Sequence, residues 1–258
     1  MVLAHTPPST NTRHNNSLLN GIAALRVLVR SGRSLGVTEI ARELELSKSS
    51  THDLIMSMVG LGFVDKNEET KRYLPSPAIF EFFGSFAGDF GRNVQMQDVL
   101  RRRAQELDAT LYVSALSRKR SYVICASGRY GDTLVLGYNC PWYVSSCGRA
   151  VLSSFPETHW ERCMPGPNDE RPTDLASMDH VHLHAVLRET RVRGVAWNNG
   201  ESQPDLTSVA AAIPVVGRVR DRAVAIVLDS KEMALRDAGE MERQVRVVAR
   251  ELASALGN

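Results

Sequence analysis

The residues best suited to chemistry near the amino terminus are small polar groups and cations that follow Ser47. Ser47 is a good N-cap for a helix from Lys48 to about Val59, because its hydroxyl can accept a hydrogen bond from a free amide of the first turn. The helical repeat places four residues inward: Thr51, Leu54, Ile55 and Met58. The polar side holds Lys48, Ser49, Ser50, His52 and Asp53, with Met56 beside them. Such side chains in the first turns of a helix can approach base edges and phosphates.

A shorter helix before this one and a hairpin after it complete the pattern of a winged helix-turn-helix. Ile40, Ala41 and Leu44 share one face, and Glu45 with Leu46 makes the turn. Residues 63–65 then predict a strand, residues 67–70 a turn and residues 71–73 a returning strand. Two cations, Lys71 and Arg72, lie near the tip of this wing. A small helical hairpin of no special function would show similar caps and faces, but the cap, the turn and the wing in this order favour DNA binding.

Composition sets limits on what surrounds this module. The chain has 258 residues, 43% of them apolar, which is enough for one large or two ordinary cores. No stretch approaches the length of a membrane span and the amino terminus lacks a signal-peptide core, so we expect a cytoplasmic protein. The formal charge is only +2, and residues 1–84 carry nine Lys and Arg against eight Asp and Glu. Affinity for phosphate must therefore come from where individual cations are placed on the module, and from the presence of two copies of the module.

The pattern divides the chain into a tail, a first domain, a linker and a second domain. Residues 1–16 lack periodicity and are expected to be disordered. We expect Ser17 to cap a supporting helix whose apolar stripe is Leu18, Ile22, Leu25 and Val29, and the winged domain to span residues 17–78. Residues 79–91 predict an aromatic-rich linker helix, typical of a dimer contact or spacer.

Residues 92–258 predict an α+β domain, a sheet with helices packed on it. The expected helices are one through Val99 to Leu107, one that begins near Ser145, and two at residues 179–192 and 240–256. The expected strands cover residues 110–116, 121–126, 133–138, 195–198, 209–216 and 223–229.

Several segments together make the chain resemble the IclR family of bacterial transcriptional regulators. They are TEIARELELSKSSTHDLI, GFVDKNEETKRYL, PWYVSSCGRAVLSSF, RGVAWNNGESQPDLTSVAAAIPV and AVAIVLDSKEMAL. The resemblance implies a winged reading head, a linker helix and a GAF-like C-terminal domain that binds a small organic molecule, often a carboxylic or aromatic acid. It also implies dimers or tetramers on palindromic operator DNA, and no cofactor.

The resemblance further implies an effector site in the second domain. Its expected residues are Ser146, Cys147, Asn198, Leu206, Ser208, Leu228 and Ser230. Two positions depart from the family's pattern: Asp53 stands where an Arg is usual in the recognition helix, and Gly148-Arg149-Ala150 replaces Gly-Lys-Ala. The first departure leaves the operator sequence open, whereas the second keeps the charge and adds donors.

Three further interpretations stay open at this point. The helix start near Ser145 and Ser146 can bind an anion, or Ser145 can merely cap the helix. Cys147 at that helix start could have a lowered pKa and act as an enzyme's nucleophile, although no base stands in a recognisable arrangement with it. The chain could also bind DNA without any ligand. The four cysteines predict reduced thiols, and His180, His182 and His184 predict surface histidines rather than a metal site.

Overall fold

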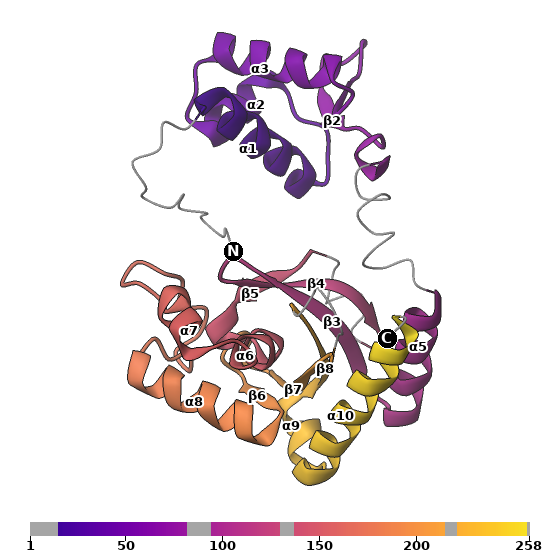
Figure 1. Ribbon diagram of the computed structural model, residues 1–258. Helices are drawn as coiled ribbons and strands as arrows, with labels where there is room; N and C mark the ends of the chain where they lie inside the picture. Colours follow the sequence, from indigo (N-terminus) through magenta and orange to yellow (C-terminus); the bar gives the residue numbers. More distant parts are fainter. Residues whose placement is uncertain (1–14, 82–93, 130–136, 215–220, 257–258) are drawn as a thin grey trace. The chain divides into compact units, whose positions relative to one another are not determined.

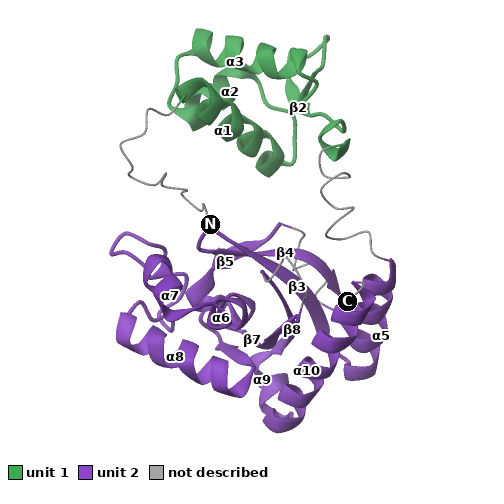
Figure 2. Ribbon diagram, in the orientation of Figure 1, with its two compact units in different colours: residues 1–86 green, residues 87–258 purple. Residues whose placement is uncertain are grey.

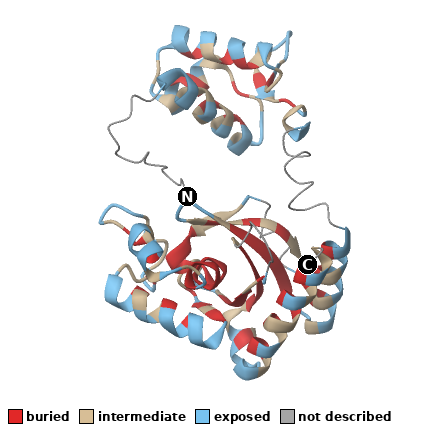
Figure 3. Ribbon diagram, in the orientation of Figure 1, coloured by how far each residue is buried: buried red, intermediate tan, exposed pale blue. Residues whose placement is uncertain are grey.

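The protein, seen here as a computed structural model, is described at residues 15–81, 94–129, 137–214 and 221–256. These residues form two compact units, one within residues 1–86 and the other within residues 87–258 (Figure 2). Each unit has its own buried interior (Figure 3). The predicted α+β class, a helical reading head followed by a sheet domain, is confirmed.

The first unit packs three helices against a two-stranded antiparallel hairpin (Figure 1). Its elements are α1 (Asn16–Ser31), α2 (Val37–Leu44), α3 (Lys48–Gly60), β1 (Val64–Lys66) and β2 (Tyr73–Pro75). In the hairpin, Asp65 lies opposite Leu74, and Leu35 forms an isolated bridge with Tyr73 that ties the start of α2 to the wing. The core residues are Ala24, Leu28, Leu35, Ile40, Ile55, Met58, Val64 and Tyr73.

Two expectations about α1 are wrong. The N-cap is Asn15, whose side chain accepts a hydrogen bond from the amide of Leu18, and not Ser17. The helix buries Ala24 and Leu28, whereas Leu18, Ile22 and Val29 of the expected stripe are exposed. The expected stripe and the row of Ala24 and Leu28 both have helical spacing. The row that contains the small residue Ala24 is the one that faces α2 and α3. A small side chain lets helices approach closely, so size decided which apolar row became the core.

The second unit is a six-stranded antiparallel sheet with helices on both faces. The strands lie in the order β5-β4-β3-β8-β7-β6. They span β3 (Thr110–Ser117), β4 (Arg120–Ser127), β5 (Asn139–Pro141), β6 (Ala196–Asn199), β7 (Leu206–Ala212) and β8 (Arg222–Asp229). The helices are α5 (Val94–Leu107), a 3-10 turn η1 (Trp142–Val144), α6 (Ser146–Ser153), α7 (Glu157–Cys163), α8 (His180–Arg193), α9 (Ser230–Ala234) and α10 (Ala238–Ala255).

Alternation along the strands decides which helix each residue meets. On β8, Val224, Ile226 and Leu228 join the core under α5 and α10, which lie side by side (Figure 1). Ala223 and Ala225 belong to the core under α6 instead. A strand sends successive side chains to opposite faces. The face under α6 therefore carries small residues, and α6 can lie close to the sheet.

The sequence missed three short elements, namely β5, α7 and α9, because each is too short for a periodic pattern. The expected strand at residues 209–216 is β7, which begins three residues earlier, at Leu206. The expected tail (residues 1–16), the linker helix (79–91) and the strand at 133–138 fall largely outside the described residues. Among the described helices, none is long and apolar enough to cross a membrane.

Candidate functional site

The recognition-like helix α3 begins as its sequence predicts. The Ser47 hydroxyl accepts a hydrogen bond from the Ser50 amide at 3.1 Å, and the Thr51 hydroxyl donates to the Ser47 carbonyl at 2.9 Å. Glu45 turns the chain between α2 and α3 with a φ of 55°, in the left-handed region. Thr51, Ile55 and Met58 are buried, so the inward face is confirmed.

The opposite face of α3 is open to solvent. Lys48, Ser49, Ser50, His52 and Asp53 are all exposed. The Asp53 side chain is 84% exposed, and the His52 ring lies beside it, with Nδ1 3.4 Å from Asp53 Oδ1. Asp53 forms no ion pair with Lys48 or Arg42, two described cations that lie near it in the sequence. The carboxylate is thus free to meet whatever approaches this face.

The two cations of the wing do different things. Lys71 sits at the tip with a φ of 54° and pairs with Glu68 at 2.9 Å, two-thirds exposed. Arg72 turns back into the unit instead: its Nη2 donates to the Ser34 carbonyl at 2.8 Å and to Glu39 Oε2 at 2.6 Å. Arg72 therefore has partners inside the unit, and its contact with DNA stays a prediction. The guanidinium fastens the wing to the start of α2.

Glu39 is the acceptor that draws Arg72 inward. The Gly36 amide donates to its carboxylate at 2.9 Å in a capping box at the start of α2. This bond, with those from Arg33 and Arg72, lowers the pKa of Glu39 to about 2. The carboxylate is ionised at all physiological pH values and holds both arginines.

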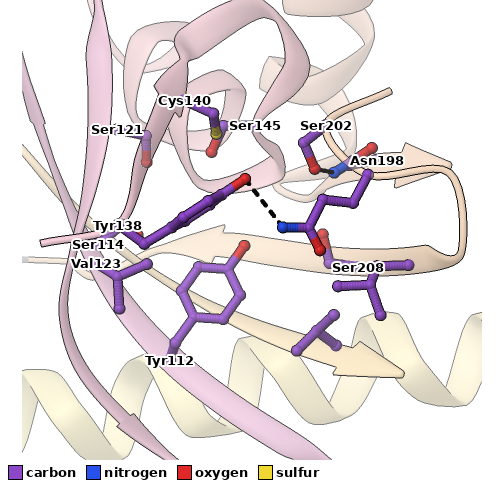
Figure 4. A pocket seen from close by; sticks show the side chains of 13 residues that line it. Tyr112, Ser114, Ser121, Val123, Tyr138, Cys140, Ser145, Asn198, Ser202 and Ser208 are labelled. Carbon is purple, nitrogen blue, oxygen red and sulfur yellow. Dashed lines mark hydrogen bonds between the residues drawn. The ribbon is translucent and has the colours of Figure 1, made fainter. Parts of the chain in front are cut away.

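The second unit contains a cavity between the start of α6, the strands β3, β4, β7 and β8, and the loop after β6. Its volume is about 440 Å³, part of which is open solvent. Thirteen described residues line it (Figure 4). Three are aliphatic: Val123, Leu206 and Val227. The others are polar and uncharged: Tyr112, Ser114, Ser121, Tyr138, Cys140, Ser145, Asn198, Ser202, Gln203 and Ser208.

Hydrogen bonds between side chains fix much of this wall. Gln203 Nε2 donates to the Tyr138 hydroxyl at 3.2 Å, and Asn198 Nδ2 donates to the Ser202 hydroxyl at 2.7 Å (Figure 4). In contrast, the buried Ser114 hydroxyl has no oxygen or nitrogen partner among the described residues. An unsatisfied buried hydroxyl costs free energy that a ligand or water could recover.

The titratable groups of the wall are neutral at physiological pH. Burial raises the pKa of Tyr112 well above its usual value, and it also raises the pKa of Tyr138. Burial raises the pKa of the Cys140 thiol to about 11. These groups therefore offer O–H and S–H donors and no charge.

Arg149 is the cation of α6, and four of its five N–H groups bond to partners within the unit. It is 3% exposed. Its Nε donates to the Tyr143 carbonyl at 3.0 Å, its Nη1 to the Trp197 carbonyl at 2.7 Å and its Nη2 to Glu201 Oε1 at 2.7 Å. Glu201 lies in the loop that also carries Ser202 and Gln203. The Arg149–Glu201 pair therefore supports the wall of the cavity from behind.

Gly148, the neighbour of Arg149, is required by close packing. A Cβ at this position would lie 2.7 Å from the Cα of Trp142 in η1. Ser145 caps α6 by accepting from the Gly148 amide at 3.1 Å. The capping interpretation of Ser145 is thus correct, and the same residue also lines the cavity.

The structure brings together only part of the expected effector set. Asn198, Leu206 and Ser208 line the cavity. Ser146 is fully buried behind it, and its hydroxyl lies 2.8 Å from that of Ser208.

Three expected effector residues lie elsewhere. Leu228 faces α5 and α10, because β8 alternates and its neighbour Val227 takes the cavity side. Ser230 begins α9 and bonds to Thr207 at 3.0 Å. Cys147 belongs to α6 and is 1% exposed, with its sulfur 3.7 Å from the Ala223 carbonyl of β8.

Sequence reasoning also missed lining residues, above all Tyr112, Ser114, Tyr138 and Gln203. Tyr112 and Ser114 are two apart on β3, so the period of a strand would have placed them on one face. Tyr138 and Gln203 come from loops, and no periodic signal marks them.

The surroundings of Cys147 do not support the open alternative of a nucleophilic enzyme site. Burial raises the pKa of Cys147, which is the opposite of the lowering that a nucleophile needs. His180 bonds to the Pro165 carbonyl at 2.8 Å and His184 lies 3.0 Å from Glu161. Within the described residues, no three His, Cys, Asp or Glu side chains are grouped to hold a metal.

Comparison with known proteins assigns both units. Residues 17–68 match the IclR helix-turn-helix domain, and residues 93–254 match the C-terminal domain of the bacterial transcriptional regulator IclR. The chain belongs to the IclR family. Its relatives are regulators of transcription and not enzymes.

Individual relatives match over most of their length at low identity. The transcriptional repressor IclR of Escherichia coli K12 is 25% identical over 81% of this chain and 77% of its own. The glycerol operon regulatory protein of Streptomyces coelicolor is 24% identical over 95% of this chain and 96% of its own. Both matches include the reading head and the sheet domain of this IclR-family chain.

Solved structures agree in fold. IclR of Thermotoga maritima superposes with a TM-score of 0.70 at 21% identity, covering 95% of this chain and all of the other (100%). An IclR homologue from Microbacterium hydrocarbonoxydans, crystallised with 4-hydroxybenzoate, superposes with a TM-score of 0.74 at 16% identity, covering 93% and 98%. At these identities the likeness establishes the fold of this IclR-family chain and nothing about its ligand.

Proposed function

We propose that this transcriptional regulator binds palindromic operator DNA as a cytoplasmic homodimer or tetramer, and that a small organic effector in the cavity of the second unit controls that binding. In this proposal residues 17–78 read DNA, residues 79–91 form a linker helix and residues 92–258 sense the effector. The observation that carries the proposal is the exposed polar face of α3 in a chain that matches both IclR domains.

The DNA contacts we propose come from α3 and from the tip of the wing. Lys48, Ser49, Ser50 and His52 supply one cation and several hydrogen-bond donors at the start of α3, where a recognition helix enters the major groove. Lys71 supplies a second cation at the wing. Because the proposed contacts at the start of α3 and the tip of the wing include only these two lysines, a single copy would bind weakly, and two copies on two half-sites would supply the missing affinity.

The effector site we propose is the cavity beside α6. Asn198, Leu206 and Ser208 are its members from the expected set. The Microbacterium homologue's complex with 4-hydroxybenzoate supports a small organic ligand. The family resemblance alone would make that ligand a carboxylic or aromatic acid. If this chain binds an acid, the carboxylate must be met by amides at the start of α6 and by hydroxyls, because the described lining residues carry no charge.

A selection experiment tests the DNA part of the proposal. Duplexes that the purified protein retains from a random library should contain an inverted repeat, and the full repeat should bind more tightly than one half-site. Lys48→Ala should weaken binding and flatten the dependence of log K on log[salt] by about one unit per lost phosphate contact, that is, by about two units for a dimer that loses one contact in each copy. Lys231→Ala, an exposed change in the second unit, is the matched control and should have no effect. Equal affinity for the repeat and the half-site would contradict binding as a dimer.

A further inference from the structure

The wall of the effector cavity is rich in groups that can both donate and accept hydrogen bonds. Hydroxyls of Tyr112, Ser114, Ser121 and Tyr138 line it, and Asn198 and Gln203 add side-chain amides. A hydroxyl offers one donor and two acceptor sites, and an amide offers both kinds. Such a wall satisfies a ligand group that also donates and accepts. It is less suited to a carboxylate, which only accepts.

The described lining residues carry no charge to meet an ionised ligand. No Lys, Arg, His, Asp or Glu is among them, and neither of the lining tyrosines nor Cys140 is ionised at neutral pH. Arg149 is a poor counter-ion, because it does not line the cavity, Glu201 already neutralises it, and four of its five N–H groups bond to Glu201 and to the Tyr143 and Trp197 carbonyls. A charge moved from water into a cavity without a partner is strongly disfavoured.

The amides at the start of α6 do not replace a counter-ion. Ser145 accepts from one of them, the Gly148 amide, and the Ser146 hydroxyl faces Ser208 rather than the open space of the cavity. The other amides carry only the partial charge of a helix end, which is weaker than a full counter-ion. The same wall excludes an ammonium ligand, since no described lining residue is acidic. The remaining apolar surface, Val123, Leu206 and Val227 together with the tyrosine rings, accepts a carbon skeleton.

We infer that the effector of this regulator is a small uncharged molecule carrying hydroxyl groups, such as a polyol or a hydroxylated aromatic alcohol, and not a carboxylate. The inference rests on the proposed function of the cavity as the effector site. One hydroxyl of the ligand would pair with the Ser114 hydroxyl, which has no oxygen or nitrogen partner among the described residues. Another would insert between Gln203 and Tyr138. Their 3.2 Å hydrogen bond would then be replaced by two hydrogen bonds, one from each side chain to the ligand hydroxyl.

Matched pairs of alcohols and acids test the ligand class by titration calorimetry and thermal shift. The probes are glycerol with glycerate, xylitol with xylonate, and 4-hydroxybenzyl alcohol with 4-hydroxybenzoate. Within a pair the skeleton is similar and the charge differs. We expect the alcohol of the pair that binds to bind at least tenfold more tightly than its acid. Tighter binding of the acid would overturn the inference and leave the cavity as the effector site.

A lysine placed in the wall of the cavity is the second test of the ligand class. Gln203→Lys should raise the affinity for the acid of that pair at least tenfold and lower that for the alcohol, whereas Gln203→Met, uncharged and of similar length, should not favour the acid. An acid affinity that Gln203→Lys leaves unchanged would also overturn the inference. Binding by no member of any pair would contradict the cavity as an effector site, and hence the effector part of the proposed function. Operator titrations report separately on the DNA part.

Discussion

Removal of Glu201 should destabilise the second unit, because it would leave the buried Arg149 without a counter-ion. The side chains are 16% and 4% exposed and their closest atoms are 2.7 Å apart. Loss of one partner from a buried ion pair costs about 3–5 kcal/mol. We expect the lower end, about 3 kcal/mol, because Arg149 keeps its bonds to the Tyr143 and Trp197 carbonyls.

The expected measurement is a thermal or urea unfolding curve of Glu201→Ala followed by tryptophan fluorescence. All three tryptophans lie in the second unit, so the signal reports that unit alone. A loss of about 3 kcal/mol corresponds to a fall in melting temperature of roughly 6–12 °C for a unit of this size. Glu201→Gln retains a hydrogen-bond acceptor and should lose less.

Glu157→Ala is the matched control. It also breaks a 2.9 Å bond to an arginine, Arg188, but both of those side chains are exposed. Water and salt screen such a pair, so its loss should leave the unfolding curve unchanged. If Glu201→Ala and Glu157→Ala shifted the curve equally, the argument that Arg149 is held by a buried pair would be refuted.

Three further changes have defined outcomes. The hydrogen bond from Arg103 keeps the pKa of Glu251 below 4.5. Ionised Glu251 therefore stabilises the folded state above its unfolded-state pKa, and this stabilisation is lost as the pH falls. In Glu251→Gln, the free energy of unfolding should therefore fall less steeply below about pH 4.5. Gly148→Ala forces a Cβ against the backbone of η1 and should cost about 1–3 kcal/mol by calorimetry, whereas Gly166→Ala, with nothing within 4 Å, should cost nothing measurable. Asp53→Arg should tighten binding to scrambled duplex and steepen its salt dependence; weaker binding would show that residue 53 does not face the phosphates.

Periodic elements could be predicted from the sequence, and so could the ends that carry a cap. Ser47 and Gly194 mark helix ends by local chemistry: Ser47 caps α3, and Gly194 follows α8 in the left-handed region with a φ of 71°. The choice of stripe on α1 could not be predicted in this way. Two apolar rows had the same spacing, and only the packing against α2 and α3 decides that Ala24 rather than Ile22 is buried.

The site was predicted less completely, because its residues meet across the sheet. Leu228 and Val227 are neighbours in sequence, but successive strand residues point to opposite faces of the sheet. They therefore belong to different cores. Tyr138 and Gln203 are 65 positions apart and meet through loops whose course no local pattern encodes. Three of the residues expected from the family likeness line the cavity, and strand register places others, such as Leu228, on the opposite face of the sheet.

Two arginines whose positions suggest a ligand contact are internal instead. Arg72 lies in the wing and Arg149 at a helix start, where cations commonly meet phosphates or carboxylates. Each instead pairs with a glutamate distant in sequence, Glu39 at a separation of 33 and Glu201 at a separation of 52. A nearby glutamate neutralises the arginine's charge and accepts its N–H donors. The role of such a cation therefore depends on a partner that the local sequence does not reveal. We therefore expect the proposed DNA and effector sites to rely on neutral donors more than the arginine content of the chain suggests.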